Sequence, residues 1–136
     1  MLKFAQVILI LFVTACAGTG TKNISDLSID NNKNKTKIFF YRPSSFMAAA
    51  VLAKITVNGS EAGLLGNGEY LEYEIEPQNF SIKVDYGSIN GLGMGTDSIS
   101  AVGERGKNFY YLVNIDTGFF GASWKINETT KSGFQR

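Results

Sequence analysis

From Lys37 onward, hydrophobic and polar residues alternate along much of the chain, and this period of two predicts β-strands. The alternation is clearest in residues 70–86, where apolar positions alternate first with glutamates and then with other polar residues. Pro77-Gln78-Asn79 separates the two halves of this stretch. We therefore predict an antiparallel hairpin over residues 70–86, with one face buried and the other in water.

The register of this hairpin follows from the requirement that directly opposed residues share a face of the sheet. A two-residue turn at Gln78-Asn79 places Glu74 opposite Lys83 on the exposed face. On the buried face, the same register places Tyr73 opposite Val84. The pair of opposite charges is expected to contribute about 0.2–1 kcal/mol.

Five other segments have the composition of strands. They cover residues 37–42, 54–58, 61–65, 108–115 and 123–128. Pro43 ends the first of them, and Asn58-Gly59 makes a tight turn between the second and the third. Residues 108–115 are apolar on both faces, which predicts a central strand that is covered on two sides.

The segments together predict an all-β fold. Turn residues follow one another at the spacing typical of sandwiches and barrels. The alanine-rich residues 46–53 are expected to form a loop or an irregular crossing, with a helical turn as the alternative. For about seven or eight short strands, the economical architecture is a single antiparallel β-sandwich with two sheets packed face to face.

The first 16 residues have a different pattern. One cation, Lys3, is followed by an apolar run from Val7 to Val13 and then by small residues, which is the order of a secretory signal peptide. The run is too short for a transmembrane helix, which needs about 20 apolar residues to cross about 30 Å of hydrocarbon. Residues 1–15 are therefore predicted to be a signal peptide.

The four residues Val13-Thr14-Ala15-Cys16 resemble the lipobox of bacterial lipoproteins. The resemblance implies cleavage between Ala15 and Cys16 and attachment of diacylglycerol to the Cys16 sulfur. Two or three acyl chains hold a protein at a bilayer far more firmly than one chain does. Position 17 is alanine and not aspartate, which in enterobacterial sorting favours the outer membrane, facing the periplasm. The alternative is an ordinary secreted protein with a chance cysteine after its cleavage site.

Polar stretches flank the predicted domain. Residues 16–36 are rich in Asn, Lys, Ser, Thr and Asp, so we expect a lipidated N-terminus followed by a flexible linker whose few aliphatic residues dock only transiently. The sandwich is expected over residues 37–130. Residues 131–136 are expected to be a frayed polar tail.

Composition narrows the chemistry that this domain can perform. The chain has 13 basic and 12 acidic residues, one cysteine and no histidine. A nucleic-acid surface or a polybasic membrane patch needs clustered Lys and Arg, so neither is expected. The single cysteine excludes an intrachain disulfide, and the lack of histidine removes the commonest metal ligand and acid–base group. We predict no metal and no cofactor.

Four motifs occur in order along the chain. They are Arg42-Pro43-Ser44-Ser45-Phe46, Val57-Asn58-Gly59, Leu65-Gly66-Asn67-Gly68-Glu69-Tyr70 and Gly106-Lys107-Asn108-Phe109-Tyr110-Tyr111-Leu112-Val113. Over residues 36–116 this series resembles the bacterial domain-of-unknown-function family numbered 2846. The resemblance implies a β-sandwich related to transthyretin-like and PEGA-type domains, often in small lipoproteins, and it implies no activity. That family usually has Pro-Gly after the glutamate-rich strand, so here the positive-φ position would fall to Asn79.

Two groups of residues allow a catalytic hypothesis. Ser44 and Ser45 could serve as nucleophiles only with a lysine or a carboxylate as base, and capping of a proline turn explains them more simply. Arg42 beside them is explained as one member of a strand-end ion pair. The glutamates at positions 72, 74 and 76 have the spacing of glycosidase carboxylates, but the alternation predicts that they are exposed.

Two further motifs give weak signals for ligands. The glycine-rich residues 91–95 are followed by no helix whose N-terminus could bind a phosphate, so we interpret residues 87–96 as a mobile hairpin connection. Asp97 and Asp116 lack the spacing of a calcium-binding loop.

Aromatic residues beside glycines are the remaining functional candidates. The predicted binding surface comprises Arg42, Ser44, Phe46, Phe119, Phe120 and Trp124. Apolar loops at one end of a sandwich can bind a partner, although such residues also close the end of a core. We expect a non-catalytic binding or structural protein of the cell envelope with an unidentified envelope protein as partner. The alternatives are an envelope enzyme using serine or carboxylate chemistry and a carrier of a small apolar ligand.

Overall fold

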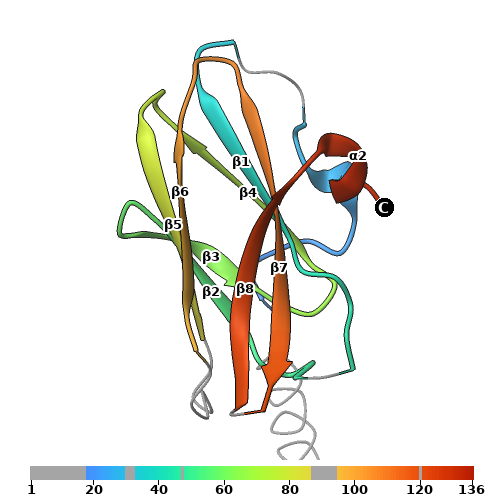
Figure 1. Cartoon of the computed structure of the whole chain (residues 1–136). Coiled ribbons are helices and arrows are strands. Elements are labelled where there is room, and N and C mark those ends of the chain that lie inside the picture. Colours follow the sequence, from blue (N-terminus) through green and yellow to red (C-terminus); the bar gives the residue numbers. More distant parts are fainter. Residues whose placement is uncertain (1–17, 30–32, 47, 87–94, 120) are drawn as a thin grey trace, which may run out of the picture.

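The computed structural model describes residues 18–29, 33–46, 48–86, 95–119 and 121–136. Within these ranges, eight strands form two four-stranded sheets that pack face to face (Figure 1). The strands are β1 (Thr36–Tyr41), β2 (Ala53–Val57), β3 (Ser60–Leu65), β4 (Tyr70–Ile75), β5 (Asn79–Tyr86), β6 (Asp97–Val102), β7 (Asn108–Gly118) and β8 (Gly121–Thr129). A 3-10 turn, η1 (Ile24–Asp26), and a short helix, α2 (Lys131–Phe134), flank them. The predicted all-β sandwich is confirmed.

The strand order is β4-β1-β7-β8 in one sheet and β3-β2-β5-β6 in the other. Neighbouring strands are antiparallel except for β1 and β7, which run parallel with Lys37 opposite Asn108 and Tyr41 opposite Leu112. The chain therefore changes sheets after β1, after β3, after β4 and after β6. Because of these crossings, strands that follow one another in sequence are often not neighbours in a sheet.

The connections gather at two opposite ends of the sandwich. One end, here called the Arg42 end, carries the loop after β1, the β3–β4 turn and the β7–β8 turn, because Tyr41 at the end of β1 lies opposite Tyr70 at the start of β4. The other end, here called the Glu104 end, carries the β2–β3 turn, the β4–β5 connection and the β6–β7 turn.

Several local predictions are confirmed. β1 ends before Pro43, and the β2–β3 turn has φ angles of 49° at Asn58 and 80° at Gly59, as a two-residue hairpin turn requires. β7 lies between β1 and β8, and Phe109, Tyr110 and their neighbour Tyr111 are all buried, as expected for a central strand with both faces covered. The strand that the alternation did not single out is β6.

The predicted hairpin over residues 70–86 is wrong. β4 pairs with β1, whereas β5 lies in the other sheet between β2 and β6. Glu74 lies opposite Lys37, and Tyr73 lies opposite Ile38. The alternation identified the buried face of each strand, but strands that face each other across a sandwich show the same alternation as strands that lie side by side.

The two β5 residues that we predicted as partners of Glu74 and Tyr73 lie opposite residues of β2 instead. Lys83 lies opposite Thr56, and Val84 lies opposite Ile55. Residues 76–78 carry the chain from one sheet to the other instead of closing a hairpin. The tight turn that would have set the predicted register is therefore not needed.

The predicted positive φ angle at Asn79 is also wrong. Asn79 is the first residue of β5, and among the described residues other than glycine only Ala48 and Asn58 have positive φ angles. A crossing between two sheets turns the chain more gradually than a two-residue hairpin does, so no residue in it has to adopt the left-handed conformation.

A core of aliphatic and aromatic side chains fills the space between the sheets. Phe40, Tyr111 and Trp124 are its largest members and are fully buried. One side of the sandwich is closed where β6 meets β8, since the Asp97 carboxylate accepts a hydrogen bond from Ile126 N at 3.0 Å. The start of β6 and β8 are thereby held together across the two sheets.

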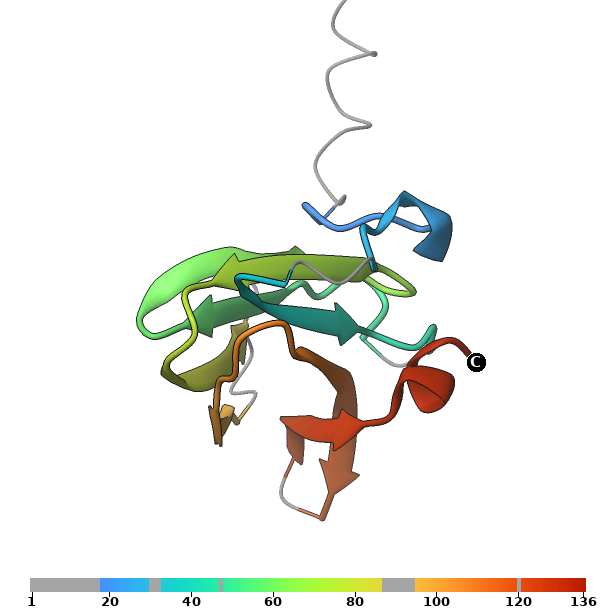
Figure 2. The ribbon, with the colours of Figure 1, turned by 90° about the horizontal axis from the view of Figure 1, so that it is seen from above.

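A second hydrophobic cluster, which we call the outer cluster, covers the outer face of the β4-β1-β7-β8 sheet. Its buried members are Phe39, Tyr110 and Phe134. The Phe134 ring centroid lies 6.1 Å from that of Phe39 and 5.3 Å from that of Tyr110. Figure 2 shows that the N-terminal segment and α2 lie on the same side of the sandwich, where they cover this face.

The outer cluster corrects the prediction of a polar tail over residues 131–136. These residues begin with helix α2, whose N-cap residue Thr130 accepts a hydrogen bond from Gly133 N at 3.1 Å. Phe134 is fully buried. The single aromatic residue of the tail outweighs its polar composition, because the outer face of β1 and β7 offers it an apolar site.

The prediction of a flexible linker over residues 16–36 is wrong for residues 18–29. Thr19 N donates to Leu64 O at 2.7 Å, and Thr21 and Tyr70 exchange two backbone hydrogen bonds of 2.8 and 2.7 Å. Further along, aliphatic side chains that we expected to dock only transiently pack into the outer cluster; they are Ile24, Leu27 and Ile29. The segment thus lies along β3 and β4.

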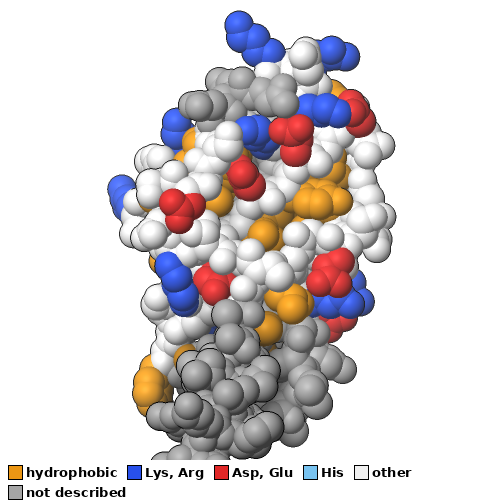
Figure 3. All heavy atoms as spheres, turned by 180° about the vertical axis from the view of Figure 1, so that it is seen from behind, with side chains coloured by type: hydrophobic (Ala, Val, Ile, Leu, Met, Phe, Trp, Pro, Cys, Tyr) orange, Lys and Arg blue, Asp and Glu red, His pale blue; other side chains and the backbone are white. Residues whose placement is uncertain are grey.

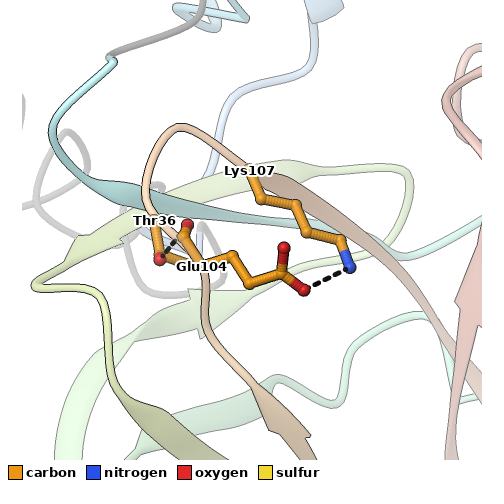
Figure 4. Close-up of polar contacts among 3 residues, drawn as sticks. All are labelled: Thr36, Glu104 and Lys107. Carbon is orange, nitrogen blue, oxygen red and sulfur yellow. Dashed lines mark hydrogen bonds and ion pairs between the residues drawn. The ribbon is translucent and has the colours of Figure 1, made fainter.

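Short turns close the Glu104 end. Thr36 donates its side-chain hydrogen bond to Glu104 O at 2.7 Å, and Lys107 Nζ lies 3.4 Å from Glu104 Oε1 (Figure 4). Gly106 N also donates to Lys35 O at 2.9 Å. The β6–β7 turn is in this way tied to the start of β1.

Candidate functional site

Arg42 is the central residue of the Arg42 end. It follows β1 directly, and only 1% of its surface is exposed. Its guanidinium group donates to the carbonyl oxygens of Val51, Ala48 (2.8 Å) and Leu65 (3.3 Å). One buried side chain therefore holds the loop that follows β1 against the end of β3.

The charge of Arg42 has two compensating neighbours. Its guanidinium carbon lies 4.9 Å from the centroid of the Trp124 ring, within the range of a cation–π interaction. Burial lowers the pKa of Arg42, and the Glu69 carboxylate opposes this shift. Glu69 itself is buried and accepts a hydrogen bond from Gly66 N at 2.7 Å. The predicted strand-end charge is thus buried, and it binds mainly carbonyl groups.

Residues 48–52 form an irregular crossing between the sheets, as predicted for residues 46–53. Ala48 adopts a positive φ angle of 52°, and Val51 N donates to Ala48 O at 3.0 Å. Ala48 and Val51 also supply the two carbonyl oxygens of this loop that accept hydrogen bonds from Arg42. Sequence reasoning missed this role, because the alternation says nothing of where the donors of a buried arginine point.

The serines of the motif lie against the β3–β4 turn. Ser45 N donates to Asn67 Oδ1 at 2.8 Å. Gly68 has a φ angle of +71°, which favours glycine, and it packs against the Ser44 side chain. A small cleft of about 180 Å³ lies between residues 42–45 and residues 113–115 of β7.

The lysine that approaches Ser44 is Lys22 of the N-terminal segment. Its Nζ atom lies 4.0 Å from the position of a Cβ on Gly68, which Ser44 also contacts. Lys22 donates a hydrogen bond to Asn67 O, and its side chain is exposed. A lysine that activates a serine is normally desolvated, so this arrangement suits a structural tie better than a Ser–Lys dyad.

The predicted aromatic surface is divided by the structure. Phe46 and Phe119 are fully exposed, with relative exposures of 104% and 97%. Trp124 is not exposed at all, because it lies on the inner face of β8 and packs in the core beneath Arg42. Trp124 therefore closes the end of the core, which was the alternative for these aromatics. Phe120 lies outside the described residues.

Glutamates on β4 and just after it contact neighbouring segments of the chain. Glu72 accepts a hydrogen bond from Ser28 N at 3.1 Å, and Glu76 forms an ion pair with Lys35. Lys37, which is buried, donates to Ser28 O at 2.7 Å beside Glu72. These carboxylates are exposed, as predicted, and Glu72 helps to hold the N-terminal segment on β4.

Other predicted ligand positions have no cluster of donors around them. Among the residues that the structure describes, no group of three or more His, Cys, Asp or Glu side chains could hold a metal ion. The glycine-rich residues 91–94 and the cysteine at position 16 lie outside the described part of the chain. In the described ranges, no helix is long and apolar enough to cross a bilayer.

The family model described as "Protein of unknown function (DUF2846)" matches residues 32–123, more than half of the chain. The chain belongs to the DUF2846 family. The match includes the whole of the Arg42 loop and all strands up to the start of β8. It does not include residues 18–29 or helix α2. The two segments that pack onto the outer face of β1 and β7 in the outer cluster therefore lie outside the family domain. No curated protein matches the chain.

Proposed function

We propose that this member of the DUF2846 family is a lipoprotein of the bacterial cell envelope, held at the outer membrane through Cys16, and that its sandwich is a non-catalytic binding or structural module. The observation that carries the proposal is the order of a single cation, an apolar run and the lipobox-like residues 13–16, which end in the sole cysteine of the chain.

The bonding of the candidate residues favours a structural role over catalysis. Arg42 binds three carbonyl groups, Lys22 binds Asn67 O, and Glu72 binds Ser28 N. Side chains that are used in this way contribute to the stability of the fold and have little capacity left for a substrate. On the face shown in Figure 3, Lys and Arg of the described residues are interspersed with Asp and Glu, so this face has no basic patch of the kind that binds a nucleic acid.

Metabolic labelling tests the anchor. Cells that express the full chain are grown with radioactive palmitate, and the protein is isolated and fractionated. We expect label on the natural chain and its recovery with the outer membrane. The matched control is Cys16→Ser, which should carry no label and should leave the membrane fraction. An unlabelled natural chain, or a Cys16→Ser variant that still sediments with membranes, would contradict the proposal.

Crosslinking on native membranes, followed by mass spectrometry, tests the binding role. A specific envelope protein should be recovered with the natural chain and lost when exposed residues of its contact surface are changed. The enzymatic alternative is tested by Ser44→Ala, Ser45→Ala and Lys22→Ala. Loss of an envelope phenotype in these variants, with unchanged folding, would favour serine chemistry over a binding module.

A further inference from the structure

The N-terminal segment leaves almost no slack between a lipid on Cys16 and the sandwich. Gly18 packs so closely against Leu64 O and Gly66 N that a Cβ atom would come within 2.5 and 2.7 Å of them. The chain is then fixed by the hydrogen bonds of Thr19 and Thr21 to β3 and β4. Only two peptide steps separate Gly18 from Cys16, so their Cα atoms are at most about 7.6 Å apart.

A free linker would behave very differently. A flexible chain of about 20 residues has a root-mean-square span of about 25 Å and would let the domain tumble above the bilayer. The docked segment replaces this span with a tether of about a third of the length. The position at which the segment docks therefore decides which part of the domain faces the membrane.

The segment docks at the Arg42 end. Gly18 contacts the end of β3 and the β3–β4 turn, and Lys22 contacts the same turn through Asn67 O. The topology places the loop after β1 and the β7–β8 turn at this end as well. Residues 18–29 then run away from it along β4, toward the start of β1.

The exposed aromatic residues are distributed unevenly between the ends. Phe46 lies in the loop after β1, and Phe119 lies in the β7–β8 turn, so both are at the Arg42 end. The third large hydrophobic residue with high exposure in the described chain, Val102, is at the Glu104 end and is only 64% exposed. Aromatic side chains partition favourably into the interfacial region of a bilayer.

We propose that the docked N-terminal segment orients the sandwich so that the Arg42 end rests on the bilayer, with Phe46 and Phe119 in the headgroup region and the Glu104 end directed away from the membrane. This inference rests on the proposed attachment of lipid to Cys16. It makes the membrane surface itself the partner of the two exposed phenylalanines. An envelope protein would then meet the sides of the sandwich or the Glu104 end.

Depth measurements on the full lipidated protein test the orientation. Single cysteines are introduced by Phe46→Cys, Phe119→Cys and, as the matched control, Val102→Cys, and each is labelled with the environment-sensitive dye NBD. The proteins are reconstituted into vesicles of phosphatidylethanolamine and phosphatidylglycerol that carry spin-labelled lipids. We expect a blue shift and quenching of the dye at positions 46 and 119, and neither change at position 102.

A second pair of variants tests whether docking is the cause. Thr19→Pro and Thr21→Pro, made together, remove the N–H groups that donate to Leu64 O and Tyr70 O, whereas Thr19→Ser and Thr21→Ala, made together, keep both. In the double proline protein the tether lengthens, so quenching at position 46 should fall, and in the double control protein it should stay unchanged. Equal quenching in both variants would overturn the role of the docked segment.

The outcomes separate this inference from the proposed function. Mass spectrometry of the purified protein first determines whether Cys16 carries acyl chains. An unmodified Cys16 overturns the lipoprotein proposal, and the inference with it. A lipidated protein whose dyes at positions 46, 119 and 102 respond alike overturns the orientation alone and leaves the anchor in place.

Discussion

The two ends of the sandwich are closed in different ways. At the Arg42 end, one buried guanidinium binds carbonyl groups from the loop after β1 and from the end of β3. At the Glu104 end, short turns are held by several separate bonds, such as Thr36 to Glu104 O and Gly103 N to Gln78 O at 3.1 Å. One side chain thus fixes the long irregular loop at the Arg42 end, whereas several separate hydrogen bonds fix the short turns at the Glu104 end.

The way in which each end is closed affects which side chains it can expose. The loop after β1 is long enough to present Phe46 to the exterior while its backbone stays fixed by Arg42. The turns of the Glu104 end use their polar groups for closure. Single substitutions should therefore be most costly at the Arg42 end and progressively cheaper at the Glu104 end.

The largest effect is expected from Arg42→Leu. The substitution removes the Arg42 donor from three carbonyl groups, of which Ala48 O keeps Val51 N as a donor, and it should lower the free energy of unfolding by about 3–5 kcal/mol. Urea unfolding of the mature chain with Cys16→Ser, followed by tryptophan fluorescence, measures this loss. Arg42→Lys is the control: one ammonium group cannot reach all three oxygens, so an intermediate loss is expected. A loss below about 1 kcal/mol for Arg42→Leu would show that the end does not depend on this residue.

The next largest effect is expected at the β2–β3 turn of the Glu104 end. Asn58→Ala places an ordinary side chain at a φ angle of 49° and removes the acceptor of the 2.9 Å hydrogen bond from Ser81 N, which together should cost about 1–2 kcal/mol. Asn58→Gly keeps the turn conformation and loses only the side-chain bond, so its loss should be smaller. If both variants lose equally, the hydrogen bond and not the backbone conformation dominates this turn.

A smaller effect is expected from Thr36→Val. The change replaces the hydroxyl that donates to Glu104 O with a methyl group of similar size in a fully buried site, and it should cost about 0.5–1.5 kcal/mol. Glu104 O keeps a second donor, Lys107 N at 3.1 Å, which limits the loss. Urea unfolding in the same Cys16→Ser background gives the comparison with Arg42. A loss as large as that of Arg42→Leu would remove the distinction between the two ends.

The sequence allowed every strand except β6 to be predicted, but not all of the strands' neighbours. The period of two in residues 70–86 correctly showed which side chains of β4 and β5 are buried, since each strand has one wet face. It could not show that Glu74 lies opposite Lys37, because pairing across a sheet and facing across a core leave the same pattern in a single chain.

The outer cluster could be predicted only in part. The apolar character of both faces of residues 108–115 indicated that something covers β7, but not what covers it. The covering residues, Phe134 and three aliphatic residues of the N-terminal segment, are isolated in polar stretches, where composition argues for disorder. For the candidate site, the sequence pointed to Arg42 but not to its carbonyl partners, which come from loops without a periodic signal.

The smallest effect is expected from Glu104→Gln. The ion pair of Glu104 with Lys107 joins side chains that are 63% and 48% exposed, so water and salt already screen most of its energy, and its loss should cost less than about 0.5 kcal/mol. Urea unfolding at low and at high salt measures both the loss and its screening. The backbone carbonyl of Glu104, which Thr36 binds, is unchanged by the substitution. A loss for Glu104→Gln that exceeds the loss for Thr36→Val would mean that side-chain charge, and not the bond to the backbone carbonyl, ties the β6–β7 turn to β1.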